Sequence, residues 1–394
     1  MLDLAKKGKY FVLAIGLTGA IWGAVSQVHA EDSSFHRFWP DNLFAVAFPS
    51  ETLGFVAGYG GSVLRTKDAG ETWEASYIGR NELIRRISFV DENTGWAVGH
   101  RGSIFFTEDG GDSWIVQKEI AGIYLRDVSF VDRNNGWVVG HEANIWNTKD
   151  GGKSWQKQKL LGFEGRDLPR LHGVFAKDNN SALLVGEFGV IGHTENGGDH
   201  WLISPIDISV TWLAIDGNDE VAYVVGLDGN AVRLTLATDD ERLEIVARVS
   251  KKRALKEARE RAKAIRLGRE YTGSTYGGIP ASEIEYSVTP IVSQTGEHLL
   301  DVDMGGNGEA LIVGRSTLIK ARGLNTEMLT AGAGFPLGFI WLGGIDVLPG
   351  GEFWASGIRG LVVSGDFEKQ SYDEAFNLAA SGKIRLISSR WGEN

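Results

Sequence analysis

The sequence predicts an all-β protein, a seven-bladed β-propeller. Three observations predict it: a glycine that recurs at nearly constant spacing, a turn ending in tryptophan behind the first four of these glycines, and short strands separated by turn residues. A repeat of ~40 to 50 residues containing only short strands is typical of propeller blades rather than of helical solenoids. The recurring glycines are Gly58, Gly99, Gly140, Gly186, Gly226, Gly314 and Gly357.

Each repeat has the composition of one four-stranded antiparallel blade. In the second repeat we expect strands at 87–90, 95–99 and 103–107, and a fourth that begins near Trp114. Gly, Asn and Asp occupy the reversals between them. Because one such sheet cannot cover its own apolar faces, the chain of 394 residues is expected to close into a single ring.

The turn before the fourth strand follows the pattern S/T-x-D-x-G-x-S/T-W, which is the Asp-box or BNR repeat. We expect its aspartate to accept hydrogen bonds from amides two and three residues on, its glycines to adopt positive φ, and its tryptophan to pack across the blade. A fourth copy is degenerate, with Asn196 in place of aspartate. All of these jobs are structural, so no catalytic role is assigned. The predicted structural residues are Asp68, Trp73, Asp109, Trp114, Asp150 and Trp155.

The N-terminus reads as a secretory signal peptide over residues 1–30, which leaves 31–394 for the propeller. Three lysines precede an apolar run at 11–25, and Val28-His29-Ala30 offers a cleavage site after Ala30. The alternative is an uncleaved membrane anchor, although the run is shorter than the ~18 residues of a typical spanning helix. The chain has no cysteine, so it has neither disulfides nor a lipid-modified cysteine. We expect a periplasmic protein, either free or associated with the inner membrane.

One interval between repeat glycines is double length and contains a predicted helical insertion, 240–285, between blades 5 and 6. Residues 241–269 are rich in Ala, Lys, Arg, Glu and Leu, which favours a helix. The chain carries a net charge of −11, yet the segment from Arg248 to Glu270 contains ten basic residues and only three acidic ones. A narrow apolar stripe is predicted on this helix, formed by Leu255, Ala258, Ala262 and Ile265.

This basic helix has two interpretations. It is either a solvated excursion lying against the propeller, or a docking element for an acidic partner or an anionic membrane. Nucleic acid is not expected as a partner, because the remaining surface is acidic and repels phosphate. Lys252, Arg253 and Arg259 are the candidate partner-binding residues of this segment.

The repeats resemble those of the photosystem II assembly and stability factor family of cyanobacteria and plastids. The resemblance rests on 85–99 and 125–140, which share the pattern SFVD-x-N-x-GW-x-VG and continue into T-x-DGG-x-SW. It implies a seven-bladed propeller with no enzymatic activity and no cofactor, which binds membrane-protein subunits during assembly.

Two departures from the family pattern shape the expected partner. Cyanobacterial members typically carry a lipoprotein cysteine, which is absent here, and a long basic helix between blades is unusual for them. Bacteria that do not photosynthesise have exported relatives of this propeller, some alongside RND-type exporters. The resemblance therefore implies a scaffold for an integral membrane protein. The partner is either a photosystem-type subunit or an RND-type exporter, and the identity of the neighbouring genes would distinguish the two.

A candidate partner-binding surface lies where successive blades begin. Basic side chains just before or within the first strand of a blade are expected at one exposed rim of the central channel, and the family associates an arginine-rich patch with partner binding. The alternative is that they are unremarkable strand-start charges. His100 and His141 follow the repeat glycine, but their separation gives no local chelate, so no metal site is predicted. The candidate arginines are Arg85, Arg86, Arg126 and Arg170.

Two alternative functions remain open at this point. Sialidase-like glycoside hydrolases also carry Asp-boxes and use a tyrosine with a glutamate, for which Tyr124, Tyr223 and Glu187 are the candidates. The other alternative is a propeller that binds a small polar ligand in its channel. No feature of the sequence selects such a ligand, so no small-molecule substrate is assigned.

Overall fold

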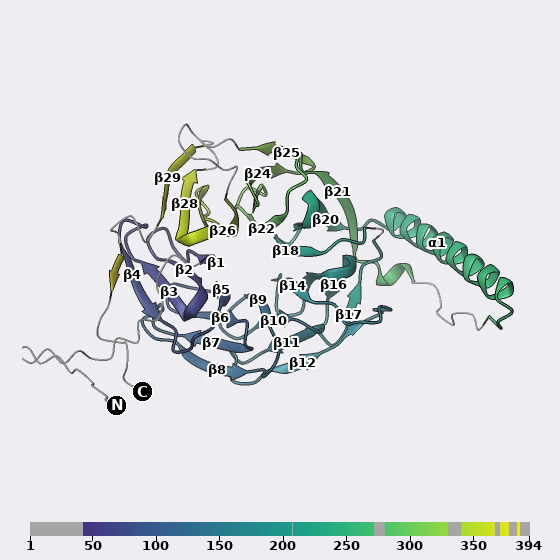
Figure 1. Ribbon diagram of the computed structural model, residues 1–394, viewed down its shortest axis with the longest axis horizontal. Helices are drawn as coiled ribbons and strands as arrows, with labels where there is room; N and C mark the ends of the chain where they lie inside the picture. The colour runs from purple at the N-terminus through teal and green to yellow at the C-terminus, as the bar shows by residue number, and fades with distance from the viewer. Residues whose placement is uncertain are drawn as a thin grey trace, which may run out of the picture. The chain divides into compact units, whose positions relative to one another are not determined.

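The computed structural model describes residues 42–206, 208–271, 280–329, 340–366, 371–377 and 384–386. In this part of the chain, seven antiparallel sheets follow one another around a ring, as blades 1 to 7 (Figure 1). The predicted all-β, seven-bladed β-propeller is therefore confirmed. The predicted signal peptide lies outside the described residues. Among the helices that are described, none combines the length and apolar character needed to cross a bilayer.

The first three blades use consecutive strands. Blade 1 comprises β1 (Leu43–Ala47), β2 (Gly54–Gly58), β3 (Ser62–Thr66) and β4 (Trp73–Tyr77). Blade 2 comprises β5 (Ile84–Phe89), β6 (Gly95–Gly99), β7 (Ser103–Thr107) and β8 (Ile115–Glu119). Blade 3 comprises β9 (Leu125–Phe130), β10 (Gly136–Gly140), β11 (Asn144–Thr148) and β12 (Gln156–Gln158).

The remaining blades keep this order, with one extra strand and one insertion. Blade 4 comprises β14 (Leu171–Ala176), β15 (Ala182–Gly186), β16 (Ile191–Thr194) and β17 (Trp201–Ile203), with β13 (Leu160–Leu161) parallel to β17. Blade 5 comprises β18 (Trp212–Gly217), β19 (Val221–Gly226), β20 (Asn230–Leu236) and β21 (Tyr286–Val292). Blade 6 comprises β22 (Leu299–Met304), β23 (Ala310–Gly314), β24 (Thr317–Arg322) and β25 (Asn325–Met328). Blade 7 comprises β26 (Leu342–Val347), β27 (Glu352–Gly357), β28 (Leu361–Asp366) and β29 (Ser371–Asn377).

The first strand of every blade lies innermost and contacts the first strand of the next blade, all the way from β1 through β26 and back to β1. The repeat glycine is needed where the second strand meets a bulge in this inner strand. A Cβ built on Gly140 would lie 2.4 Å from the carbonyl oxygen of Tyr124, and one on Gly357 would lie 2.2 Å from that of Trp341. Any larger residue would therefore push the inner strand away, which explains why this glycine recurs in all seven blades.

Polar side chains of the inner strands link one blade to the next. The carboxylates of Asp216 and Asp303 accept the backbone N–H of Met304 and Val347 at 2.9 and 2.7 Å. The hydroxyl of Ser129 accepts that of Ala176 at 3.1 Å in the same way. An inner strand is the edge of its own sheet, so these bonds satisfy amides that no strand neighbour reaches.

The three complete Asp-boxes share one hydrogen-bond geometry. Asp109 accepts the N–H of Ser113 at 2.8 Å, the hydroxyl of Ser113 at 2.6 Å and the hydroxyl of Thr107 at 2.9 Å. The predicted acceptor role is confirmed, but the donor is the amide four residues on, rather than those two and three residues on. The difference arises because the Thr107 hydroxyl already accepts the amides of Asp109 and Gly111, the latter at positive φ. Equivalent bonds surround Asp68 and Asp150.

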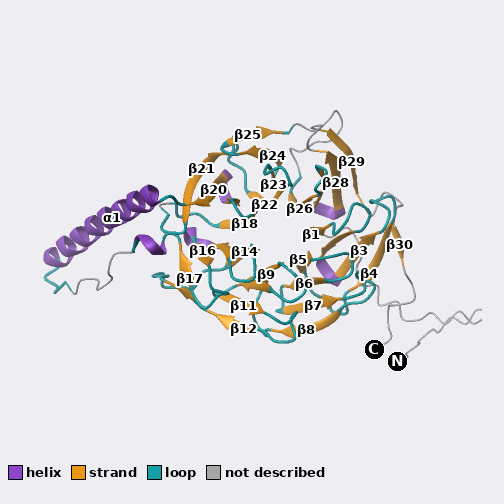
Figure 2. Ribbon diagram, turned by 180° about the vertical axis from the view of Figure 1, so that it is seen from behind, coloured by secondary structure: helices purple, strands orange, loops and turns teal. Residues whose placement is uncertain are grey.

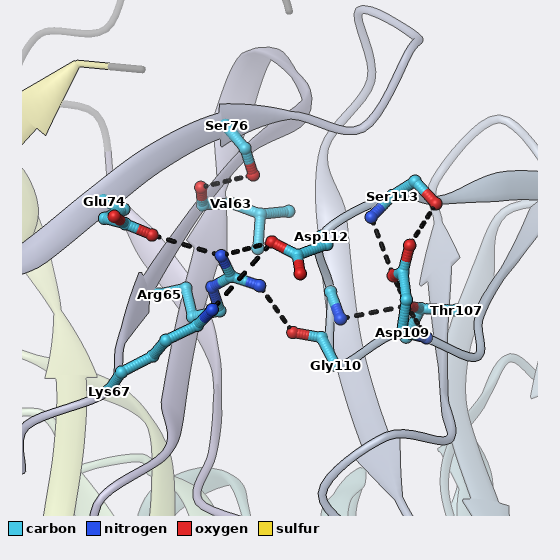
Figure 3. Close-up of polar contacts among 11 residues, drawn as sticks. Val63, Arg65, Lys67, Glu74, Ser76, Thr107, Asp109, Gly110, Asp112 and Ser113 are labelled. Carbon is cyan, nitrogen blue, oxygen red and sulfur yellow. Dashed lines mark hydrogen bonds and ion pairs between the residues drawn. The ribbon is translucent and has the colours of Figure 1, made fainter.

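The second and third boxes also accept hydrogen bonds from the preceding blade. In Figure 3 the guanidinium of Arg65, on β3, reaches across to the second box and donates to the carbonyl of Gly110 and the carboxylate of Asp112, both at 2.7 Å. Gln117 donates to the carbonyl of Gly151 in the third box at the same distance. The box tryptophans support this packing: Trp73 is fully buried, Trp155 is 9% exposed, and Trp114 is partly buried with its edge against the ring of a neighbouring phenylalanine. These Asp-boxes thus stabilise the contact between neighbouring blades.

Replacing Asp109 with alanine is expected to lower the free energy of unfolding by about 1 to 2 kcal/mol, because two Ser113 donors and one Thr107 donor lose their acceptor. Thermal unfolding followed by circular dichroism measures the change. Glu108→Ala, an exposed position in the same turn, is the matched control and should leave the midpoint unchanged. An unaltered midpoint in the Asp109 variant would contradict the structural role of the box.

An additional strand near the C-terminus extends blade 1. Strand β30 (Ile384–Leu386) pairs in parallel with β4, outside the four strands that blade 1 already has. Blade 1 therefore gains a fifth strand from near the C-terminus, although it already has four strands of its own.

The helical insertion lies inside blade 5, after β20 and before β21, and so precedes blade 6. Helix α1 (Asp239–Arg266) is capped by Thr238, whose hydroxyl and amide exchange hydrogen bonds with Glu241. It extends away from the ring in Figure 1 and, seen from behind, in Figure 2. Only its first turns pack: Ile245 is 8% exposed and forms a small cluster with Ala237 and Ile284. The stripe predicted from Leu255 to Ile265 is not packed against the propeller; these two side chains are exposed.

Candidate binding face at the rim of the channel

The second residue of each inner strand lies in the bulge, at the end of the channel where the inner strands begin. We call this end the rim face. In blades 1 to 4 these residues are aromatic or basic, whereas in blades 5 to 7 they are Leu213, Leu300 and Gly343. At this strand position, basic side chains therefore occur only in blades 2 to 4. The residues of blades 1 to 4 are Phe44, Arg85, Arg126 and His172.

Arg85 stacks its guanidinium over the ring of Phe44, 4.9 Å from the ring centroid. Burial, together with the positive charges of Arg126 and Arg86, lowers the pKa of Arg85 to about 10. It forms no ion pair with any residue that the structure describes. Arg85 therefore remains charged at neutral pH and is held in place without a carboxylate to neutralise it.

Arg126 and Arg170 continue the basic rim into blades 3 and 4. The Nε of Arg126 donates to Nε2 of His141 at 3.1 Å, and Arg170, which is 56% exposed, lies 3.5 Å from a carboxylate oxygen of Glu187. Burial and the charges of Arg126 and Arg170 lower the pKa of His141 to about 4. Because this imidazole is neutral, it can accept from Arg126 and orient it.

Aromatic side chains accompany the arginines. Tyr124 is 51% exposed and lies between the rings of His100 and His141, with centroid separations of 5.7 and 5.0 Å. Tyr59 is 44% exposed and contacts Phe44 edge to face. Exposed aromatic rings beside guanidinium groups are the composition of a peptide-binding surface.

Arg86 differs from the other predicted rim residues, and the expectation that it is exposed is wrong. Its side chain is 19% exposed and points into the channel, where it forms a bidentate pair with Asp301 at 2.6 and 2.9 Å and a third bond to Asp127 at 3.1 Å. Burial opposes ionisation, but the charges of Asp301 and Asp127 raise the pKa of Arg86. Arg86 therefore ties blades 2, 3 and 6 together across the ring.

The channel contains a cavity of about 310 Å³ that is lined by this cluster and by residues further along the inner strands. The fifth residue of the inner strand is an aspartate in blades 5, 6 and 7: Asp216, Asp303 and Asp346. Burial raises the pKa of Asp216 and Asp346 to about 7, and burial with the charges of those two neighbours raises the pKa of Asp303 well above its usual range. The channel is thus acidic at this end and basic at the rim face.

Of the residues expected for glycoside hydrolysis, Tyr124 and Glu187 lie at the rim face, whereas Tyr223 does not. In the described part of the chain, no group of three or more His, Asp or Glu side chains is arranged to hold a metal ion. Tyr223 is 1% exposed inside blade 5, where its hydroxyl accepts the N–H of Gly323, so it cannot face a substrate together with Glu187 at the rim. The basic candidates Lys252, Arg253 and Arg259 all lie on α1.

Part of the chain matches a known protein family. Residues 39–116 and 115–211 match the family described as photosynthesis system II assembly factor YCF48. The match covers residues 39–211, which is less than half of the chain, so this part of the propeller is similar to the assembly-factor family. The matched residues span blades 1 to 4, which are also the blades with Asp-boxes and with the basic rim. No curated protein matches the chain.

Solved structures share the fold at low identity. A structure titled "YCF48 bound to D1 peptide" is 13% identical with a TM-score of 0.56, covering 83% of this chain and 92% of its own. YCF48 from Cyanidioschyzon merolae is 16% identical with a TM-score of 0.57, covering 84% and 97%. An ancestral GH74 enzyme is 13% identical with a TM-score of 0.58, covering 86% of this chain but 46% of its own. At these identities the likeness establishes the propeller and nothing about chemistry.

The acidic residues of the channel could not be recognised from the sequence. Asp127 and Asp301 occupy the third place of their inner strands, and Asp216, Asp303 and Asp346 occupy the fifth. Aligning blades 5 to 7 on their repeat glycines would have exposed this register, because the same place then carries a polar residue in several blades. The missing Asp-boxes in those blades removed the pattern that anchors the alignment.

Proposed function

We propose that this protein is a noncatalytic, exported scaffold that binds an acidic segment of an integral membrane protein at its rim face. The observation that carries the proposal is the row Arg85, Arg126 and Arg170 on successive blades, bordered by exposed aromatic rings. Guanidinium groups recognise carboxylates in a bidentate manner, and aromatic rings bind the apolar side chains between them. The family to which residues 39–211 are matched supports the same role.

Of the two partner classes expected from the sequence, the photosystem-type subunit has the better support. A similar solved propeller is bound to a D1 peptide, whereas no comparison favours an RND-type exporter. Periplasmic localisation remains part of the proposal. A sialidase-like activity has weaker support: Tyr124 and Glu187 both lie at the rim face, but Tyr223 is enclosed in its blade.

Reversing the charge of all three rim arginines (Arg85→Glu, Arg126→Glu, Arg170→Glu) is expected to weaken peptide binding by about tenfold to a hundredfold. Arg86 is left intact because it holds the channel together. Fluorescence polarisation with a labelled D1 peptide measures the affinity, and a peptide with amidated acidic groups tests the contribution of charge. The effect should shrink as salt rises, since the Debye length is ~8 Å at physiological ionic strength.

The matched control is the triple variant Arg133→Glu, Lys149→Glu, Lys153→Glu, here named the control triple. It makes the same charge change on turns at the opposite end of the strands of blade 3. The control triple should bind as the unmodified protein does. Equal binding by the rim variant and by the control triple would exclude the rim face as the peptide site.

A further inference from the structure

Helix α1 presents an exposed surface that neither the propeller nor the rim face uses. Beyond its packed first turns, Leu255 is 54% exposed and Ile265 is 71% exposed. Leu267, directly after the helix, is 50% exposed. Removing such side chains from water is favourable. Exposed apolar residues that recur with helical spacing on one helix therefore indicate a binding surface.

The spacing is helical. With ~3.6 residues per turn, Leu255, Ala258, Ala262 and Ile265 fall on one side of α1. Ile245, Val246 and Val249, which pack in the cluster with Ile284, together fall on the other side of the helix. The exposed stripe therefore points away from the only apolar contact that α1 makes among the described residues.

Basic side chains flank this stripe. Arg259, Lys263 and Arg266 lie along one edge of it, one helical turn apart or less, and all three are exposed. Lys256 and Arg261 add to the same segment, where Glu257 and Glu260 are the acidic residues. A helix with an apolar stripe, long cationic side chains at its edge and low overall hydrophobicity is suited to the interface of an anionic bilayer.

We infer that the outer part of α1, Leu255 to Arg266, binds an anionic lipid surface and holds the propeller beside the membrane. The stripe enters the headgroup region, and the flanking cations contact lipid phosphates. The 28 residues of α1 form a rod ~40 Å long that extends beyond the ring, so it can lie along a flat surface (Figure 2). The net charge of −11 keeps the body of the protein away from the same lipids, so the helix alone makes the contact.

Co-sedimentation with vesicles tests this inference directly. The full chain should bind vesicles containing phosphatidylglycerol, with binding falling as salt rises, and should not bind vesicles of pure phosphatidylcholine. The variant Arg259→Glu, Lys263→Glu, Arg266→Glu should lose on the order of a hundredfold in partition coefficient, because each cation near an anionic surface contributes independently. The control triple, which changes as many charges on blade 3, should bind as the unmodified protein does. Retained binding by the helix variant would overturn the inference.

A site-specific label tests the orientation of the helix. Because the chain has no cysteine, Ile265→Cys can be labelled with an environment-sensitive fluorophore at that one site. Its emission should shift to shorter wavelength on phosphatidylglycerol vesicles, whereas a label at Glu260→Cys, on another side of α1, should not shift. Equal shifts at both sites, or none at either, would exclude insertion of the stripe.

Two further outcomes separate lipid from protein and from the rim face. If the helix variant loses binding to a soluble acidic protein but binds vesicles normally, the occupant is a protein and the inference fails. Peptide binding at the rim face is measured without any membrane and should be unchanged in the helix variant. The two proposals can therefore fail independently.

Discussion

Replacing Arg86 with methionine is expected to lower the free energy of unfolding by about 3 to 5 kcal/mol, because it leaves two buried carboxylates without a counter-charge. Asp301 is 2% exposed and Asp127 is 7% exposed, and both direct their oxygens at the Arg86 guanidinium. Urea unfolding followed by tryptophan fluorescence measures the loss. It should be smaller at low pH, where the stranded carboxyls become protonated.

The triple variant Arg86→Met, Asp127→Asn, Asp301→Asn provides the matched control. It removes the same ion pairs but leaves no unpaired charge, and asparagine can still accept the backbone amides of Val174 and Ile345 that the two aspartates accept. We expect the triple variant to recover a large part of the lost stability. If the single and triple variants are equally destabilised, the cost lies in packing rather than in stranded charge.

Blades 1 to 4 could be predicted from the sequence because their turns are specified locally. In the second box, the hydrogen bonds that join Thr107, Asp109, Gly111 and Ser113 to one another link residues at most four apart in the chain. The repeat glycine likewise marks its strand without knowledge of the rest of the ring. Strand β21 is difficult to recognise in the sequence. It follows a long helix, and it lacks the repeat glycine and the Asp-box that mark strands elsewhere.

The channel could not be predicted in the same way. Arg86 and Asp301 are 215 residues apart and meet only because the ring closes. Sequence alone presented Arg86 as the neighbour of Arg85 in a basic rim, although the two side chains belong to successive places of one strand and lie in different environments. The two arginines can be distinguished only when the bulge is known. The bulge places the second residue of the inner strand at the rim and the third in the channel.

The acidic end of the channel makes stability depend on pH with a definite sign. The pKa of Asp216 and that of Asp346 are raised to about 7 in the folded protein, from 3.8 in the absence of burial. Between about pH 4 and pH 7 the folded protein therefore holds more protons on these groups than the unfolded chain does. Their contribution to the free energy of unfolding falls as pH rises through this interval. His141 and His172 act in the opposite sense, because burial lowers the pKa of each to about 4 and about 3.

Replacing Asp303 with asparagine is therefore expected to stabilise the protein at pH 8, by about 1 to 3 kcal/mol, since a pKa displaced by one unit corresponds to ~1.4 kcal/mol. Asparagine retains an acceptor for the amide of Val347 and offers a donor to Asp216, while removing the charge that the two neighbouring carboxylates repel. The comparison with the unmodified protein at each pH cancels the histidine contribution. The gain should be largest at pH 8 and should be lost only below pH 3.8, where the Asp303 carboxyl becomes protonated in the unfolded chain as well as in the folded protein.

Asp178→Asn is the control for this comparison. Partial burial opposes ionisation of Asp178, but hydrogen bonds from the amides of Asn180 and Ser181 lower the pKa of its carboxyl, so it is ionised in both states above pH 5. The stability difference between this variant and the unmodified protein should be the same at pH 5 and pH 8. A stability difference for Asp303→Asn that is equally flat over this range would show that Asp303 ionises normally, and that the channel opens its acidic end to water.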